Sequence, residues 1–151
     1  MVNINKRRGS DFERDIVTYL NDRINGGTFK RMAGSGALGT LMNEPALMGD
    51  IAGRVGFLPR QIRIECKAGY GGENQFVLKR EWLDKIAMES SGTYSIPIIA
   101  GRFIKAKTGV TKFIVMDINT FVYLVNEANA LKEELDKIYE KESGSDTLGL
   151  H

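Results

Sequence analysis

The chain has 151 residues, of which 42% are hydrophobic and 26% charged, a balance that is ordinary for one globular domain. The formal net charge is only +2, from 21 Lys and Arg against 19 Asp and Glu, so charge alone identifies no nucleic-acid partner. The single cysteine excludes an intramolecular disulfide. No apolar run is long enough for a signal segment or a membrane span, so we expect a cytoplasmic protein with no membrane contact.

Helical spacing begins near the N-terminus, where apolar residues recur at every fourth position in the segment 10–24. Ser10 and Glu13 match the S-x-x-E pattern of a capping box, which predicts that the helix begins at Ser10. Residues 1–8 would then form a basic N-terminal arm, whose charges lie at Lys6, Arg7 and Arg8. An ordinary solvated terminus is the alternative interpretation of these charges.

Strands and helices alternate through the rest of the chain. Strand-like segments are 28–33, 50–57, 61–68, 95–104 and 111–118, and the second and third form a predicted hairpin around Pro59. The Gly-rich segment 34–49 is predicted to be a loop, and an amphipathic helix is expected over about 78–90. The predicted order is α-β-β-β-α-β-β-α, an α/β fold with a mixed central sheet flanked by helices.

The segment QIRIECKAG places apolar and charged residues in strict alternation. A strand directs Ile62, Ile64 and Cys66 to one face, and Arg63, Glu65 and Lys67 to the other. We expect the first face to lie in the core, where Cys66 is an inert buried thiol; a reactive thiol is the alternative. The second face gathers charge.

The C-terminal segment predicts a long helix over 119–142, followed by a flexible tail over 143–151. Its apolar residues alternate spacings of three and four, which is typical of a coiled-coil seam or of a helix packed lengthwise. The seam consists of Phe121, Leu124, Ala128, Leu131, Leu135 and Ile138. It can bury against its own sheet or against another subunit. We expect a single domain over residues 1–142.

Three carboxylates are candidates for a metal site. Glu13 falls within the apolar arc of the first helix, and Asp50 begins a strand after a glycine. If that strand pairs with 61–68, Asp50 and Glu65 meet, and two adjacent carboxylates repel each other unless a cation lies between them. Oxygen ligands without a His or Cys cluster favour Mg²⁺, with Mn²⁺ as a substitute, over zinc. Lys67 beside such an ion suits phosphodiester hydrolysis.

These residues resemble the PD-(D/E)xK nuclease superfamily, with Glu13 on a helix, Asp50 after a loop and Glu65-Cys66-Lys67 as E-x-K. Within it, the segments GSDFERDIVTYL, RMAGSGA, GDIAG, IECKA and YSIPIIAGRF are similar, in order, to signature segments of archaeal-type Holliday-junction resolvases. The resemblance covers about residues 7–117. It departs at Gly49, where the family has Pro, and in the length of the loop before Asp50.

The resemblance implies a restriction-endonuclease-like fold and a homodimer that cuts paired strands of four-way DNA junctions. Glu13, Asp50 and Glu65 would be metal ligands, Lys67 the catalytic lysine, and Ser35 an assistant at the scissile phosphate. Some relatives are carried by viruses. Contacts to the DNA backbone are expected from Lys6, Arg7, Arg8, Arg31, Arg54 and Arg63.

Each residue also has an ordinary structural interpretation. Glu13 fits the third position of a capping box, and Asp50 an acid at a strand edge. Glu65 and Lys67 fit an exposed ion pair worth about 0–1 kcal/mol. Ser35 fits a flexible turn.

Two further classes of function stay open beside the resolvase. Another nuclease of the same fold would cut flaps, damaged duplex or a specific site. A non-catalytic module would bind DNA, or bind protein through the C-terminal helix.

Overall fold

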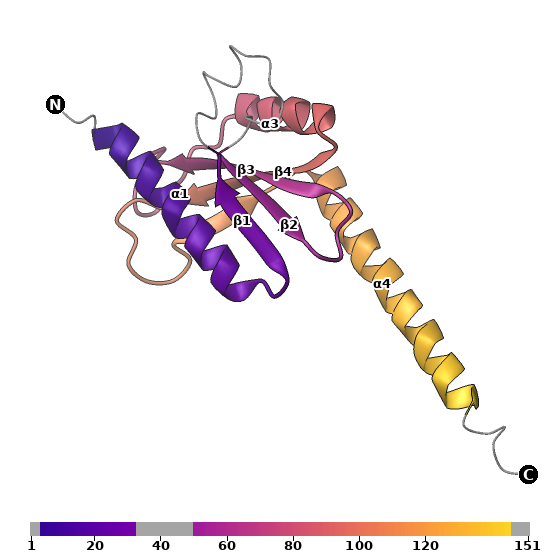
Figure 1. Ribbon diagram of the computed structural model, residues 1–151. Helices are drawn as coiled ribbons and strands as arrows, with labels where there is room; N and C mark the ends of the chain where they lie inside the picture. Colours follow the sequence, from indigo (N-terminus) through magenta and orange to yellow (C-terminus); the bar gives the residue numbers. More distant parts are fainter. Residues whose placement is uncertain (1–3, 33–49, 146–151) are drawn as a thin grey trace, which may run out of the picture. The chain divides into compact units, whose positions relative to one another are not determined.

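The computed structural model describes residues 4–32 and 50–145, and its elements follow the order that the sequence predicts (Figure 1). They are α1 (Ile4–Arg23), β1 (Gly27–Arg31), β2 (Ile51–Val55), β3 (Gln61–Ala68), α3 (Arg80–Gly92), β4 (Ser95–Arg102), β5 (Lys112–Val115) and α4 (Ile118–Ser145). The α/β class is therefore confirmed. The chain divides into two compact units, residues 1–116 and 117–151, and the single domain expected over 1–142 stays a prediction.

Helix α1 begins at Ile4, so the predicted start at Ser10 is wrong. Residues 4–8 belong to the helix and do not form a separate arm, because Lys and Arg are good helix formers and extend its first turns. Ser10 is consequently interior and caps nothing. Its hydroxyl oxygen accepts hydrogen bonds from Arg31 Nη2 at 2.9 Å and from Arg14 Nη1 at 3.3 Å.

The sheet has five strands in the order β1-β2-β3-β4-β5. The predicted hairpin is confirmed, because β2 pairs with β3 antiparallel and Ile51 lies opposite Ile64. Strands β3 and β4 are parallel, and α3 makes the crossover between them. The remaining neighbours are antiparallel, so the sheet is mixed as expected. The predicted loop 34–49 lies wholly outside the described residues.

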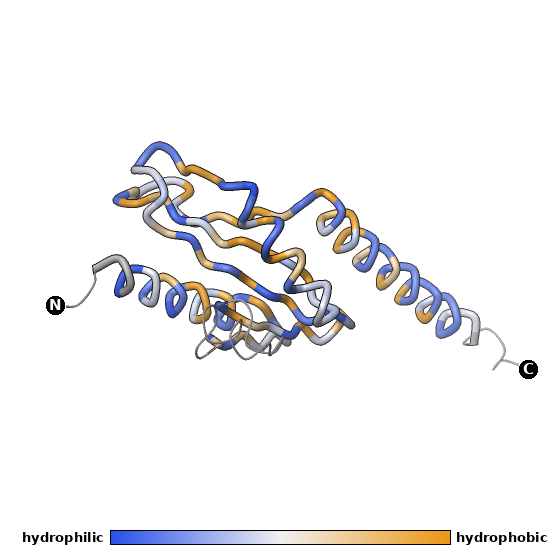
Figure 2. Tube along the Cα trace, turned by 90° about the horizontal axis from the view of Figure 1, so that it is seen from above, coloured by the Kyte–Doolittle hydropathy of each residue, from blue (hydrophilic) through white to orange (hydrophobic). Residues whose placement is uncertain are grey.

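Helices α1 and α3 cover opposite faces of β3. Ile64 lines one cavity with Ile16 and Leu20 of α1, whereas Trp82 and Ile86 of α3 form a core cluster with Ile99 of β4. Glu65 is in register with Ile99, so the charged side chains of β3 face α3. Figure 2 shows apolar residues recurring between polar ones along the strands. Both faces of β3 are therefore covered, including the one that gathers charge.

Helix α4 forms the second unit and confirms the predicted long helix, with bounds that extend to Ile118–Ser145. Asp117 precedes it and accepts hydrogen bonds from the Thr120 N–H at 3.0 Å and the Thr120 hydroxyl at 2.7 Å. Residues 143–145 of the predicted tail are helical, and 146–151 lie outside the described residues. Within the described part of the chain, no helix is long and apolar enough to span a membrane.

The close approach of β1 and β2 depends on Gly53, which lies opposite Phe29. A Cβ at position 53 would lie 2.2 Å from Phe29 Cε1, and Phe29 is only 4% exposed. We expect Gly53→Ala to lower the free energy of unfolding by about 1–3 kcal/mol, because the ring must leave its place. Urea denaturation measures this. Gly92→Ala is the control, since its Cβ meets nothing within 4 Å; equal stability of both variants would contradict the packing described.

Candidate active site

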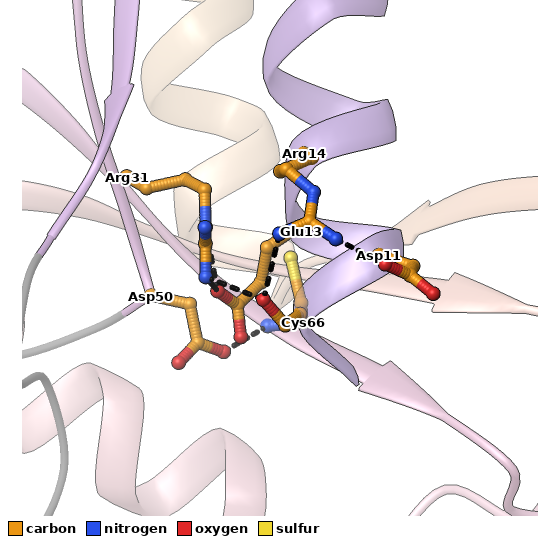
Figure 3. A network of polar contacts seen from close by, with 7 residues as sticks. Asp11, Glu13, Arg14, Arg31, Asp50 and Cys66 are labelled. Atoms are coloured by element: carbon orange, nitrogen blue, oxygen red, sulfur yellow. Dashed lines mark hydrogen bonds and ion pairs between the residues drawn. The ribbon is translucent and has the colours of Figure 1, made fainter. Parts of the chain in front are cut away.

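Asp50 is fixed between two strands by its backbone and its side chain. Its N–H donates to the Ile64 carbonyl at 3.0 Å, and its carbonyl accepts from the Met32 N–H at 2.9 Å. Its carboxylate oxygen Oδ2 accepts from the Cys66 N–H at 2.7 Å (Figure 3). Because Ile64 and Cys66 flank Glu65 in the chain, these bonds hold Asp50 beside Glu65. The predicted meeting of the two acids on paired strands is found.

Glu65 and Lys67 form an ion pair that is mostly withdrawn from solvent. Lys67 Nζ lies 2.7 Å from Glu65 Oε1, and the two side chains are 17% and 10% exposed. Lys67 Nζ also lies 5.1 Å from the centre of the Trp82 ring on α3. The interpretation as an exposed surface pair is therefore wrong, because α3 covers this face of the strand.

The charge of Lys67 is maintained by its partner. Burial lowers the pKa of the ammonium, but the hydrogen bond and the charge of Glu65 outweigh burial, and the net shift is upward. Lys67 is consequently a cation at neutral pH. Such a group can donate hydrogen bonds and stabilise negative charge, and it does not serve as a general base.

Glu13 is held by Arg31 at the end of β1. Its Oε2 accepts from Arg31 Nε at 2.9 Å and Nη2 at 2.8 Å, and Nη2 also donates to Ser10 Oγ. Figure 3 shows this pair next to Asp50 and Cys66, with Arg14 paired to Asp11 on the same turn of α1 as Glu13. Arg31 was expected to contact the DNA backbone. Its guanidinium binds Glu13 in a partly exposed pair worth about 0–1 kcal/mol, and its contact with DNA stays a prediction.

The three acids act on one another electrostatically. The pKa of Asp50 rises from 3.8 to about 6, first because the group is buried, then because Glu65 and Glu13 are negative. The Cys66 N–H and Lys67 lower it in part. Burial also raises the pKa of the Cys66 thiol, with Asp50 and Glu13 adding to the shift. Cys66 therefore stays protonated, in agreement with the inert thiol that the sequence predicts.

The donor set suits a hard divalent cation in part. Asp50 and Glu65 offer adjacent carboxylate oxygens, and their mutual repulsion is what a cation relieves. Among residues 4–32 and 50–145, no group of three or more His, Cys, Asp or Glu side chains is arranged to hold one ion. Glu13 is engaged with Arg31, so the three-ligand set stays a prediction that requires this pair to open.

The other predicted residues have different outcomes. Arg7 and Arg8 are exposed on α1, and Arg54 is exposed on β2. Arg63 is only 5% exposed on the face that α3 covers, near the charge of Glu89, so its expected contact with DNA is wrong. Ser35 and the side chain of Lys6 lie outside the described residues.

Helix α3 contributes residues that the sequence did not identify. Lys85 Nζ lies 3.9 Å from Glu65 Oε1 and 3.7 Å from Glu89 Oε1. Trp82 lies one turn earlier on the same helix, beneath Lys67. Their spacing of three residues puts both on one helical face. That spacing is the only signal in the sequence, and it identifies a shared face without naming what the face covers.

Comparison with known proteins gives one family. Residues 4–148 match the family described as phage putative PDDEXK endonuclease. No curated protein matches the chain significantly. Among solved structures, the chain is similar to Archaeoglobus fulgidus Hjc, a Holliday junction resolvase from an archaeal hyperthermophile. Identity is 20% over 70% of this chain and 73% of that chain, with a TM-score of 0.49. Likeness at this level assigns no activity by itself.

The raised pKa of Asp50 predicts a pH-dependent stability in EDTA. The folded state binds the proton of the Asp50 carboxyl group more tightly than the unfolded state does. Ionisation of Asp50 therefore lowers the free energy of unfolding as pH rises from about 4 to about 6. At about pH 7.5 we expect Asp50→Asn to raise the free energy of unfolding by on the order of 2 kcal/mol. Urea denaturation across this pH range measures the effect.

Asp84→Asn is the matched control, because Asp84 is exposed on α3 and far less buried than Asp50. Its stability profile should parallel that of the unmodified protein. The same slope between about pH 4 and 6 in Asp50→Asn and in Asp84→Asn would contradict the electrostatic description of Asp50.

Proposed function

Because the chain belongs to the family of phage putative PDDEXK endonucleases, we propose that it is a Mg²⁺-dependent resolvase of four-way DNA junctions. The observation that carries the proposal is Asp50, fixed by the Cys66 N–H beside the buried Glu65–Lys67 pair. This arrangement supplies two oxygen ligands and one cation at the end of two paired strands. The family description further supports a protein encoded by a virus.

The residues of the chain divide the work of phosphodiester hydrolysis. Asp50 and Glu65 would hold Mg²⁺, with Glu13 as a third ligand once it leaves Arg31. When bound, the ion polarises a phosphoryl oxygen and lowers the pKa of a water molecule. Lys67, a cation at neutral pH, orients the attacking water and stabilises charge that builds on the phosphate.

Rigid support favours this role for Lys67. Glu65 Oε1 holds its ammonium from one side at 2.7 Å, and the Trp82 ring lies 5.1 Å away on another. A lysine held in this way loses little side-chain freedom when it meets a phosphate, because that freedom is already restricted. The same wall of α3 limits the access of water to the ion pair, which strengthens its electrostatic effect.

The proposed substrate is branched DNA, bound by a homodimer. Arg7 and Arg8 are exposed on α1, the helix that carries Glu13, and are available to phosphates without reading sequence. A four-way junction presents two symmetry-related strands, which a two-fold symmetric dimer matches with two identical sites. Paired nicks then follow from symmetry.

Cleavage assays test the proposal directly. The protein is incubated with a labelled immobile four-way junction, a matched duplex and a flap, with Mg²⁺ and with EDTA. We expect paired symmetric nicks in the junction alone, and only with Mg²⁺. Glu65→Gln should abolish cleavage and leave junction binding equal or tighter, because it removes a negative charge near the phosphate. Ca²⁺ should support binding without cleavage.

Glu133→Gln, exposed on α4, is the control and should keep full activity. Cutting of all three substrates would replace junction resolution by a broader nuclease activity. Undiminished cleavage by Glu65→Gln would contradict the proposed active site. Binding without any cleavage by the unmodified protein would favour a non-catalytic module.

Salt dependence tests the basic end of α1. Changing Lys6, Arg7 and Arg8 together to Ala should weaken junction binding and reduce the slope of log affinity against log salt by up to about 3. Fluorescence anisotropy at several salt concentrations measures the slope. Changing Lys132, Lys137 and Lys141 of α4 to Ala removes the same charge and is the control. Equal slopes in the two triple variants would assign no phosphate contact to α1.

A further inference from the structure

A cavity of about 290 Å³ adjoins the proposed catalytic lysine. It is lined by Arg8 and Gly9 of α1 and by residues 66–70, which end β3 and begin the turn after it. We call this cavity the Arg8–Tyr70 pocket. All of its walls belong to the first unit, and a strand whose phosphate meets Lys67 has this pocket next to it.

Tyr70 is held in place by a tight turn between β3 and α3. Its carbonyl accepts from the Val77 N–H at 2.7 Å, and the Gly72 N–H donates to the Gln75 carbonyl at 3.0 Å. Gly71 has φ of +136°, and a Cβ there would lie 2.3 Å from the Gln75 carbonyl oxygen. The turn therefore requires glycine at position 71 and fixes the ring that precedes it.

Tyr70 packs against Trp82 and remains partly exposed. The centre of its ring lies 4.4 Å from the centre of the Trp82 ring, in an edge-on arrangement. Trp82 is itself buried in the core cluster with Ile86 and Ile99. Tyr70 nevertheless keeps 37% of its surface exposed and lines the pocket. A rigid, partly exposed aromatic ring beside a polar cavity is a platform on which a flat ligand can stack.

Cations surround this platform. Arg8 faces the pocket from α1, Lys67 borders it, and Lys79 Nζ lies 6.0 Å from the centre of the Tyr70 ring. Aromatic rings and cations in one groove match the two parts of a nucleotide, the base and the phosphate. A base inside a duplex is stacked on both sides, so only an unpaired or unstacked base can offer its face to Tyr70.

We propose that the Arg8–Tyr70 pocket binds one unstacked nucleotide next to the scissile phosphate, with its base on Tyr70 and its phosphate on Arg8. The inference rests on the proposed function and deepens it, because it names the feature of the DNA that the site recognises. Bases at a branch point lose stacking partners, whereas bases in a continuous duplex do not. The pocket thus favours branched over fully paired DNA.

Binding of DNA that contains 2-aminopurine tests the proposal without cleavage. The probe is placed at the single unpaired position of a gapped duplex, and at the same position of a paired duplex, in EDTA. We expect stacking on Tyr70 to quench the unpaired probe alone. Tyr70→Ala should abolish the quenching and weaken binding of the gapped DNA about ten-fold, with the paired duplex changed less than two-fold. Tyr70→Phe keeps the ring and should restore both.

Two further variants complete the test. Tyr139→Ala removes an exposed tyrosine of α4 and should change the binding of neither the gapped nor the paired DNA. Arg8 is exposed on α1, so Arg8→Gln keeps the test valid should Tyr70→Ala fail to fold. This variant should weaken binding of the gapped DNA more than binding of the paired duplex. Equal effects of Tyr70→Ala and Arg8→Gln on gapped and paired DNA, or no quenching by the unmodified protein, would overturn the pocket.

The result is independent of the outcome for cleavage. Quenching that depends on Tyr70, in a protein that cuts no DNA, would support the pocket and contradict the resolvase. If the protein cleaves junctions with Mg²⁺ but Tyr70→Ala and Arg8→Gln leave its DNA binding unchanged, the result would support the resolvase and overturn the pocket.

Discussion

The hydrogen bond from the Cys66 N–H to the Asp50 carboxylate is the contact on which the site depends. It joins the entry of β2 to the middle of β3, and it holds a negative charge next to Glu65 although the two groups repel each other. The neighbouring acids are held by partners of their own, Lys67 for Glu65 and Arg31 for Glu13. Each carboxylate is therefore positioned by a separate donor. The three acids stay close because each one has its own hydrogen-bond donor, which offsets the repulsion among them.

The buried Glu65–Lys67 pair is better explained by function than by stability. Taking two charges out of water costs several kcal/mol, and apolar residues of similar volume in place of such a pair are often neutral or stabilising. Helix α3 covers the pair because a parallel connection from β3 to β4 needs a crossover, and the crossover lies on that face of the sheet. The fold thus buries the pair at a cost. A catalytic cation that must be held rigidly is the kind of role that justifies this cost.

Local sequence patterns predicted the architecture. The features that these patterns did not predict depend on tertiary contacts. Alternation along 61–68 identified β3 and its two faces, and turn residues around Pro59 identified the hairpin, because both signals lie within a few residues. The S-x-x-E pattern at Ser10 failed because α1 begins at Ile4, and Ser10 and Glu13 instead accept hydrogen bonds from Arg31, which is distant in the chain. Alternation also placed Arg63 with Glu65, yet it does not say whether a face is covered. Only the packing of α3 determined that Arg63 is buried.

In the proposed function, recognition of DNA shape and the chemistry of cleavage meet at Lys67. In the proposed function, the exposed arginines on α1 would attract any DNA, because phosphates are alike in every sequence. The Tyr70 ring, just after the strand that carries Lys67, would require an unstacked base. A continuous duplex does not offer such a base. In the proposal, the DNA strand that offers this unstacked base is also the one whose phosphate would lie nearest Lys67. Selectivity for branched DNA would then require no reading of base edges, because one rigid turn after β3 would provide it.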